Sequence, residues 1–141
     1  IPMTLVTGVI DALKELKIKK IVVGTPYLDE INIKEAEFLY KKGFSVLNIQ
    51  GLNLTKGIEF GTVTPEYWIK FAQEINEESA DAIFLSCGGI RSTEVIDQIE
   101  QKVGKPVITS NQAQMWSCLR RAGVEDNISG FGKLFNYQLN I

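Results

Sequence analysis

Short apolar runs rich in β-branched residues alternate with longer segments of helical period along this chain, and this alternation restricts the fold more than any other feature. The runs lie at residues 20–24, 44–49, 82–86 and 106–109. The segments between them are long enough to cross over and join neighbouring parallel strands. Such crossovers are right-handed and place helices on the faces of the sheet. The sequence therefore predicts an α/β fold, a flavodoxin-like four-stranded parallel sheet with helices on both faces.

Capping signals mark where the helices are expected. The predicted helices cover residues 4–16, 32–42, 64–75, 92–103 and 111–122. Asn32 and Glu35 have the spacing of a capping box, and Thr64 followed by Pro65 suits an N-cap and the first helical position. Residues 50–63 contain three glycines and no regular period. We expect a long loop there, of the kind that serves function or mobility.

The composition excludes several kinds of site. The chain has 141 residues and no histidine, so it cannot by itself form a Ser-His-Asp site, a Cys-His site or a His-ligated metal site. A net charge of -2 argues against nucleic-acid binding. No apolar stretch approaches the ~20 residues of a membrane span, and no signal-peptide pattern is present. We expect a cytoplasmic protein that contacts neither nucleic acid nor a membrane.

The segments that directly follow the strands are the places to look for chemistry, because open parallel sheets bind ligands at the carboxyl ends of their strands. Cys87 is the most informative residue there. It follows a buried strand and precedes two glycines and an expected helix start, an environment that favours a reactive thiol. Gly88 and Gly89 let an anion approach the main-chain N–H groups closely. The alternative is that Cys87 is a buried small hydrophobe.

Other candidate residues have competing interpretations. Tyr27 either donates its hydroxyl to a developing oxyanion or is a half-buried loop aromatic. Cys118 shares a helical stripe with Met115 and Leu119, which predicts that it lies in the core. A lone arginine near a helix start, Arg91, is expected to be a solvated surface group.

Three motifs together resemble a known family. They are Val23-Gly-Thr-Pro-Tyr-Leu-Asp-Glu-Ile-Asn32, Leu85-Ser-Cys-Gly-Gly89 and Pro106-Val-Ile-Thr-Ser-Asn-Gln-Ala113, followed near the end by Phe131-Gly-Lys-Leu-Phe135. In this order they are similar to the arylmalonate decarboxylase and maleate cis-trans isomerase family of the aspartate/glutamate racemase superfamily. The resemblance implies an enzyme with no cofactor and no metal, built of two flavodoxin-like halves with the active site between them.

The resemblance assigns roles residue by residue. Cys87 matches the catalytic cysteine, and Tyr27 matches a tyrosine that hydrogen-bonds a substrate carboxylate or enediolate. Gly88 and Gly89 match main-chain donors, and Asn53 lies in the loop where the isomerases use an asparagine to bind substrate. The implied substrate is a small carboxylate or dicarboxylate.

The reaction implied first is that of an arylmalonate decarboxylase, in which Cys87 transfers a proton to the carbon next to a carboxylate. The alternatives are a maleate cis-trans isomerase and an amino-acid or hydantoin-type racemase. Ser-Cys-Gly-Gly favours the decarboxylase, whereas Ser-Asn-Gln-Ala favours the isomerase. A non-catalytic carboxylate-binding module is the alternative from another class, because the same N–H groups can hold a carboxylate without proton transfer.

The resemblance also implies that the chain holds only half of the fold. Residues 1–123 match the second flavodoxin-like domain with its entry helix, and residues 124–141 match a C-terminal return tail. The first domain is expected upstream, supplying a cysteine in racemases and isomerases or a glycine in decarboxylases. Without it the chain is expected to be inactive, with Phe135 and Leu139 exposed; the formation of a homo-oligomer is left open.

Overall fold

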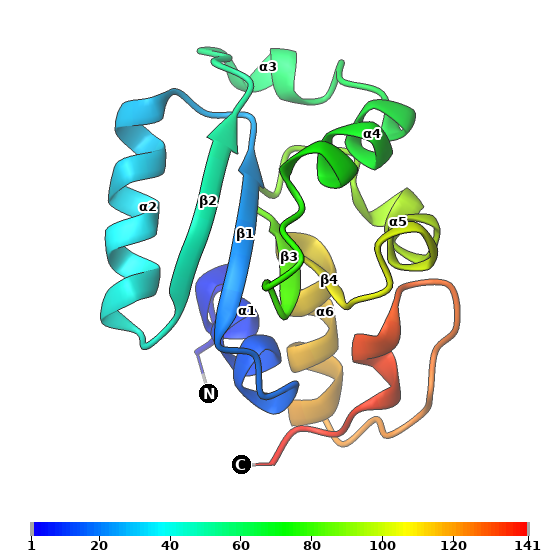
Figure 1. The fold of residues 1–141 in the computed structure, drawn as a ribbon. Helices are drawn as coiled ribbons and strands as arrows, with labels where there is room; N and C mark the ends of the chain where they lie inside the picture. Colours follow the sequence, from blue (N-terminus) through cyan, green and yellow to red (C-terminus); the bar gives the residue numbers. More distant parts are fainter. Residues whose placement is uncertain (1, 141) are drawn as a thin grey trace.

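The computed structural model describes residues 2–140, and its centre is a four-stranded sheet with the order β2-β1-β3-β4 (Figure 1). The strands are β1 (Lys20–Thr25), β2 (Ser45–Gly51), β3 (Ala82–Leu85) and β4 (Val107–Thr109). All pairs are parallel, with Val23 of β1 opposite Ile49 on one side and Phe84 on the other. The predicted α/β sheet is confirmed, and its four carboxyl ends lie along one edge.

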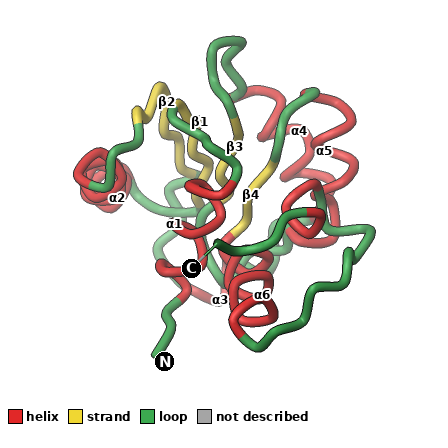
Figure 2. Tube along the Cα trace, turned by 90° about the horizontal axis from the view of Figure 1, so that it is seen from below, coloured by secondary structure: helices red, strands yellow, loops and turns green. Residues whose placement is uncertain are grey.

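Helices cover both faces of the sheet and create two separate apolar cores (Figure 2). The helices are α1 (Leu5–Glu15), α2 (Asp29–Lys41), α4 (Pro65–Ile75), α5 (Ile96–Val103) and α6 (Ser110–Arg121). Side chains alternate between the two faces of a strand. Phe84 of β3 therefore packs with α1 and α6, whereas its neighbour Ile83 packs with α4 and α5. By the same alternation, Ser86 points to the α1 side.

The helix ends follow the sequence signals in most places. Thr64 accepts a hydrogen bond from the Tyr67 N–H and Pro65 is the first residue of α4, as predicted. Gly104 ends α5 with a φ of 71°, a left-handed backbone conformation that glycine adopts without strain. The last helix begins at Ser110, one residue earlier than predicted, because Thr109 forms its capping box with Gln112.

The start of α2 differs from the prediction. The helix begins at Asp29, and the expected capping box between Asn32 and Glu35 is not formed. Asn32 is buried inside the first turn, and its side-chain oxygen accepts the Thr25 hydroxyl at 2.6 Å. The acidic residues Asp29 and Glu30 occupy the first turn instead, where their negative charges interact favourably with the positive end of the helix dipole.

The long loop after β2 and the segment after β3 each contain a short helix. Within the loop predicted for residues 50–63, the structure has the one-turn helix α3 (Gly57–Phe60) above the carboxyl edge of the sheet (Figure 1). The 3₁₀ turn η1 (Thr93–Val95) precedes α5. The helix predicted for residues 92–103 therefore begins as a 3₁₀ turn at Thr93 and becomes α-helical at Ile96.

The C-terminal tail packs on this same domain, so the prediction that Phe135 and Leu139 are exposed is wrong. Leu134 and Phe135, within η2 (Lys133–Asn136), are 0% and 3% exposed, and Leu139 is partly buried against the core that also contains residues of α1 and α6. Arg120 is the physical reason. Its guanidinium donates hydrogen bonds of 2.7 to 3.0 Å to four main-chain oxygens of the tail, those of Val124, Asp126, Phe135 and Tyr137.

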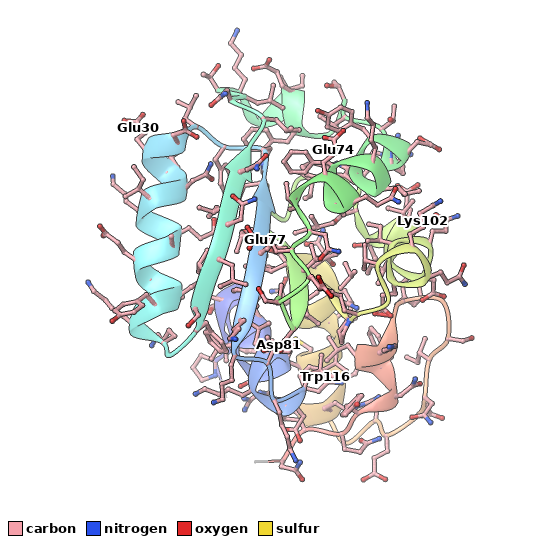
Figure 3. All side chains as sticks on the ribbon, viewed as in Figure 1. Glu30, Glu74, Glu77, Asp81, Lys102 and Trp116 are labelled. Carbon is pink, nitrogen blue, oxygen red and sulfur yellow. The ribbon has the colours of Figure 1, made fainter. Side chains whose placement is uncertain are left out.

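Two further side chains fix the neighbouring main chain. Trp116, labelled on α6 in Figure 3, donates its indole N–H to the Tyr137 oxygen at 3.0 Å. Asp81, at the amino end of the sheet, accepts the main-chain N–H groups of Lys19 and Lys20 at 2.9 and 2.8 Å. Among the described helices, none has the length and apolar character needed to cross a membrane.

Candidate active site

The strand ends of β1, β3 and β4 meet at a cavity of about 410 Å³ on the α1 and α2 side of the sheet. Its polar wall consists of Tyr27, Ser86, Cys87, Gly88 and Ser110, which come from three different strand ends. The remaining walls come from α1, α2 and β3 and are largely apolar, with Lys34 and Glu35 as the charged exceptions; the apolar lining residues are Leu5, Val6, Val9, Ile10, Ile31, Phe38, Leu39 and Phe84. The arrangement places a thiol, hydroxyls and main-chain groups beside a space for a small organic molecule.

Cys87 is held in an unusual backbone conformation at the end of β3. Its φ is 136°, which a residue with a side chain rarely adopts and which costs on the order of 1–3 kcal/mol. Two hydrogen bonds fix this geometry. The Cys87 N–H donates to Ser110 Oγ at 3.1 Å, and the Gly89 N–H donates to Cys87 Sγ at 3.3 Å. The half-buried thiol is therefore oriented by the first residue of α6 and by the glycine two positions later.

The two glycines after Cys87 have different roles in this geometry. The Gly88 carbonyl accepts the Asn111 side-chain amide at 3.0 Å, and Gly88 lines the cavity. The Gly89 N–H is directed at the sulfur. Within residues 2–140 the Gly88 N–H has no hydrogen-bond acceptor. Of the two predicted main-chain donors, Gly88 is thus the one whose N–H is available to a ligand oxygen.

Tyr27 lies half-buried at the end of β1, and a short network positions it. Thr25 Oγ1 accepts a hydrogen bond from the Tyr27 N–H at 3.1 Å and donates one to Asn32 Oδ1 at 2.6 Å. The Phe60 ring packs edge-on against the Tyr27 ring with centroids 5.7 Å apart. Burial raises the pKa of Tyr27 far above its ordinary value, and the neighbouring Cys87 and Glu35 side chains raise it further. The hydroxyl therefore stays protonated at neutral pH and is a hydrogen-bond donor.

Asn53 does not line the cavity. It is exposed, has a φ of 57°, and its N–H donates to the Tyr27 carbonyl at 3.2 Å. Two more bonds of the same kind, from Leu52 and Leu54 to the main chain of residues 25 and 26, join this loop to the Tyr27 segment. In this structure Asn53 contributes to holding that segment, and its role in binding substrate stays a prediction.

Four residues near the thiol were not assigned a site role from the sequence. Ser86 and Ser110 are 7% and 1% exposed and line the cavity beside Cys87, and Phe60 packs on Tyr27. Glu35 also lines the cavity. Burial raises the pKa of Glu35, and the nearby Ser86 side chain opposes part of that rise. The sequence held a signal for this position, because Glu35 is the one acidic residue spaced four residues from both Ile31 and Leu39. The spacing of Glu35 from Asn32 instead predicted a capping box.

The prediction that Cys118 lies in the core is wrong. Cys118 is exposed, and its stripe neighbour Met115 is 57% exposed. The buried face of α6 instead contains Ala113, Trp116, Ser117 and Arg120. Polar residues are buried there because Asp11 of α1 bonds to Ser117 at 2.8 Å and the tail carbonyls surround Arg120. The apolar stripe that the sequence suggested is displaced by partners distant in sequence.

Arg91 is a surface group, as predicted. Its guanidinium pairs with Glu94 at 3.1 Å, and both side chains are about half exposed. Arg91 does not line the cavity that contains Cys87.

Comparisons with known proteins agree with this geometry. The family model of arylmalonate decarboxylase matches residues 1–135. Arylmalonate decarboxylase from Bordetella bronchiseptica is 28% identical over 136 residues, which cover 94% of this chain and 57% of that protein.

Two solved structures of maleate isomerases have the same fold. A cysteine-to-alanine variant of the isomerase Iso from Pseudomonas putida S16, with maleate, aligns with a TM-score of 0.92 at 22% identity, over 96% of this chain and 55% of that chain. A cysteine-to-serine variant of the Nocardia farcinica maleate cis-trans isomerase, with a covalently bound succinylcysteine intermediate, aligns with a TM-score of 0.89 at 21% identity, over 93% and 54%.

The extent of these matches decides what they establish. The chain spans about half the length of the curated relatives it matches, which are named arylmalonate decarboxylase and maleate isomerase. The isomerase structures, at their low identity, establish the fold. The family model covers all but the last six residues, so both Tyr27 and Cys87 lie within the matched range. On this match, the chain belongs to the arylmalonate decarboxylase family.

Proposed function

We propose that this chain supplies the cysteine side of a cofactor-independent enzyme site that acts on a small carboxylate by proton transfer at the neighbouring carbon. The observation that carries the proposal is the shared cavity of Cys87 and Tyr27, which brings a thiol and a protonated phenol together from adjacent strands. Proton transfer to carbon needs an acid and a donor that stabilises the negative charge formed. Membership of a family whose relatives are decarboxylases and isomerases supports this assignment.

In the decarboxylase form of the reaction, the substrate is a malonate with one substituent. The bond between the central carbon and one carboxylate breaks, CO₂ leaves, and the electron pair enters the remaining carboxylate to form an enediolate. The Cys87 thiol then gives its proton to the central carbon, and the resulting thiolate takes a proton from water. No electron acceptor is required, because the reaction exchanges CO₂ for a proton.

Each part of the observed cavity suits one part of this reaction. The Tyr27 hydroxyl and the Gly88 N–H are donors for the enediolate oxygens, where negative charge increases. Apolar side chains of α1 and α2 form most of the opposite wall, and such a wall excludes water from the carboxylate that leaves. Gly89 and Ser110 orient the thiol. The site thus combines charge stabilisation with a fixed proton source.

The remaining side of the site is assigned to a preceding domain. Relatives of about twice this length contain a further segment of comparable size, and the cavity of this chain is partly open to solvent. A single cysteine suffices to deliver one proton to one face of the enediolate. Racemisation or attack on a double bond needs a second group on the opposite face.

A maleate cis-trans isomerase is the second candidate, and the relative from Alcaligenes faecalis named maleate isomerase, 26% identical over 130 residues, favours it. In that reaction a thiolate adds to one carbon of the double bond, the other carbon gains a proton, rotation follows, and elimination restores the double bond and the thiolate.

The protein with its preceding domain should be tested with phenylmalonate and maleate in D₂O by NMR. We expect either loss of CO₂ with one deuteron incorporated or conversion of maleate to fumarate. Cys87→Ala should lower kcat by at least about a thousandfold, as for a lost nucleophile or acid. Cys118→Ala is the matched control, because its exposed thiol lies outside the cavity, and it should retain activity. Turnover that survives Cys87→Ala would contradict the proposal.

A further inference from the structure

Glu35 has a position that the helix itself does not require. It lies in the second turn of α2, where the cap predicted with Asn32 is absent because Asn32 is bonded to Thr25. Within the described part of the chain, Glu35 takes part in no ion pair. A half-buried carboxyl group without a cation costs stability, so its presence needs another explanation.

The carboxyl group of Glu35 faces the reactive end of the cavity. It lines the cavity together with Tyr27, Ser86 and Cys87. Ser86, which directly precedes Cys87, is near enough to Glu35 to oppose part of the rise in the pKa of its carboxyl group. Tyr27 lines the same cavity, and the charge of Glu35 contributes to the raised pKa of its hydroxyl. Lys34 is the cation among the lining residues. Burial raises the pKa of Glu35, which favours a neutral acid able to donate or accept a hydrogen bond.

This carboxyl group interrupts a wall that is otherwise suited to an apolar substituent. Ile31, Phe38 and Leu39 of the same helix line the cavity around it. An aryl or alkyl group packed against that wall removes water from Glu35 and offers no hydrogen bond in return. A substituent with a hydroxyl or amino group restores the lost bond. A buried polar group that a ligand leaves unpaired discriminates strongly between two ligands.

We propose that Glu35 is a specificity-determining residue, whose carboxyl group beside Ser86 selects small carboxylates with a hydrogen-bonding substituent on the reacting carbon over those with an apolar substituent. The proposal rests on the proposed function, since it names the substrate class of that same site. It moves the expected substrate away from arylmalonates and toward malonates that carry a hydroxyl or amino group.

The test compares ligands of nearly equal size in the full-length protein. Hydroxymalonate, aminomalonate and methylmalonate are titrated calorimetrically into the Cys87→Ala protein, so that turnover does not interfere. We expect hydroxymalonate or aminomalonate to bind at least about tenfold more tightly than methylmalonate, the effect of one hydrogen bond to a desolvated group. The ligand that binds more tightly identifies the substituent as hydroxyl or amino.

Three variants in the same background separate specificity from general binding. Glu35→Met should abolish the preference, and Glu35→Gln, which keeps hydrogen-bonding atoms, should retain a preference for hydroxymalonate. Lys34→Met is the matched control, because it removes the neighbouring charge and should weaken all three ligands by a similar factor. A preference unchanged in Glu35→Met would overturn the proposal, as would a parent protein that binds methylmalonate equally well or binds none of the three.

Failure of the proposed function has a different signature. Turnover that does not depend on Cys87 overturns the proton-transfer chemistry, whereas the ratio of dissociation constants still measures the selectivity of Glu35. Conversely, a Cys87-dependent enzyme whose ligand preference ignores Glu35 overturns only the specificity.

Discussion

A methyl group added at Gly51 tests how firmly the main chain holds Tyr27 in place. Gly51 is the last residue of β2 and passes directly beside the segment that carries Tyr27. A Cβ atom there would lie 2.1 Å from the Tyr27 carbonyl oxygen, 2.6 Å from Asn32 Nδ2 and 3.0 Å from Thr25 Oγ1. All three distances are well inside ordinary van der Waals separations of about 3.5–4.0 Å. Gly51→Ala therefore forces the Tyr27 segment or the end of β2 to move.

The cost follows from these contacts. The closest neighbour is main chain, which cannot rotate away, so the overlap acts as overpacking of about 1–3 kcal/mol. Movement also strains the buried hydrogen bond between Thr25 and Asn32, with a net contribution of about 1 kcal/mol. We expect the free energy of unfolding to fall by about 2–4 kcal/mol. A displacement near 1 Å at Tyr27 should lower kcat/KM of the full-length protein on the order of a hundredfold.

Gly57→Ala provides the matched control for this experiment. It adds the same methyl group within the same loop region, yet no atom lies within 4 Å of the added Cβ. Urea unfolding followed by far-UV circular dichroism gives the midpoint and slope for the parent and both variants. Gly57→Ala should stay within about 0.5 kcal/mol of the parent. Equal midpoints for the two variants would show that contact with Gly51 does not hold the Tyr27 segment.

Four further predictions address other parts of the structure. Arg120→Met should lower the free energy of unfolding by about 3–5 kcal/mol, because it removes four hydrogen bonds to tail carbonyls, and amide exchange at residues 134–137 should accelerate. The raised pKa of Glu35 means that its carboxyl group binds a proton more tightly in the folded state than in the unfolded state. The stability gained from this proton is complete below the ordinary pKa of 4.5 and is lost as the pH rises through the folded-state pKa. Glu35→Gln should therefore become more stable to urea, relative to the parent, as the pH increases from 4.5 to 8. Iodoacetamide should label the exposed Cys118 of the native protein whether or not a malonate is present, whereas the malonate should protect Cys87, which peptide mapping would measure. Tyr27→Phe should lower kcat/KM by roughly ten- to a thousandfold with little change in Tm; a Tm loss of several degrees with intact turnover would assign Tyr27 to the fold.

The layout of the fold was predictable because its signals are local. β-Branched runs such as Ile21 to Val23 form a strand buried on both faces, and Thr64 with Pro65 starts a helix wherever the chain places it. The order of strands and helices then allows few topologies. For the same reason the sequence indicated that Cys87 and Tyr27 lie at one edge of the sheet, since both follow strands whose carboxyl ends share that edge, and both line the cavity there.

The errors arose where a distant partner decides the outcome. Asn32 has the spacing of a cap, yet it bonds to Thr25, and that frees Glu35 to face the cavity. Cys118 has the spacing of a core residue, yet the tail carbonyls make the neighbouring face with Arg120 the buried one. Two of these carbonyls, those of Phe135 and Tyr137, lie 15 and 17 residues from Arg120 in sequence, so they leave no periodic signal on α6. Helical periodicity therefore predicts a stripe but does not show which of two adjacent stripes is covered.

Under the proposed function, the relative placement of Cys87 and Tyr27 determines the handedness of the product. β1 and β3 are adjacent and parallel, so the phenol and the thiol reach the cavity from neighbouring positions on one wall. An enediolate held by Tyr27 and the Gly88 N–H is planar, and only one of its faces is turned toward Cys87. Within residues 2–140 the other cysteine, Cys118, is exposed on α6 and does not line the cavity, so it cannot protonate the opposite face. This chain accordingly fixes which face receives the proton from Cys87, whereas the residue that covers the open side of the cavity decides whether the second face reacts at all.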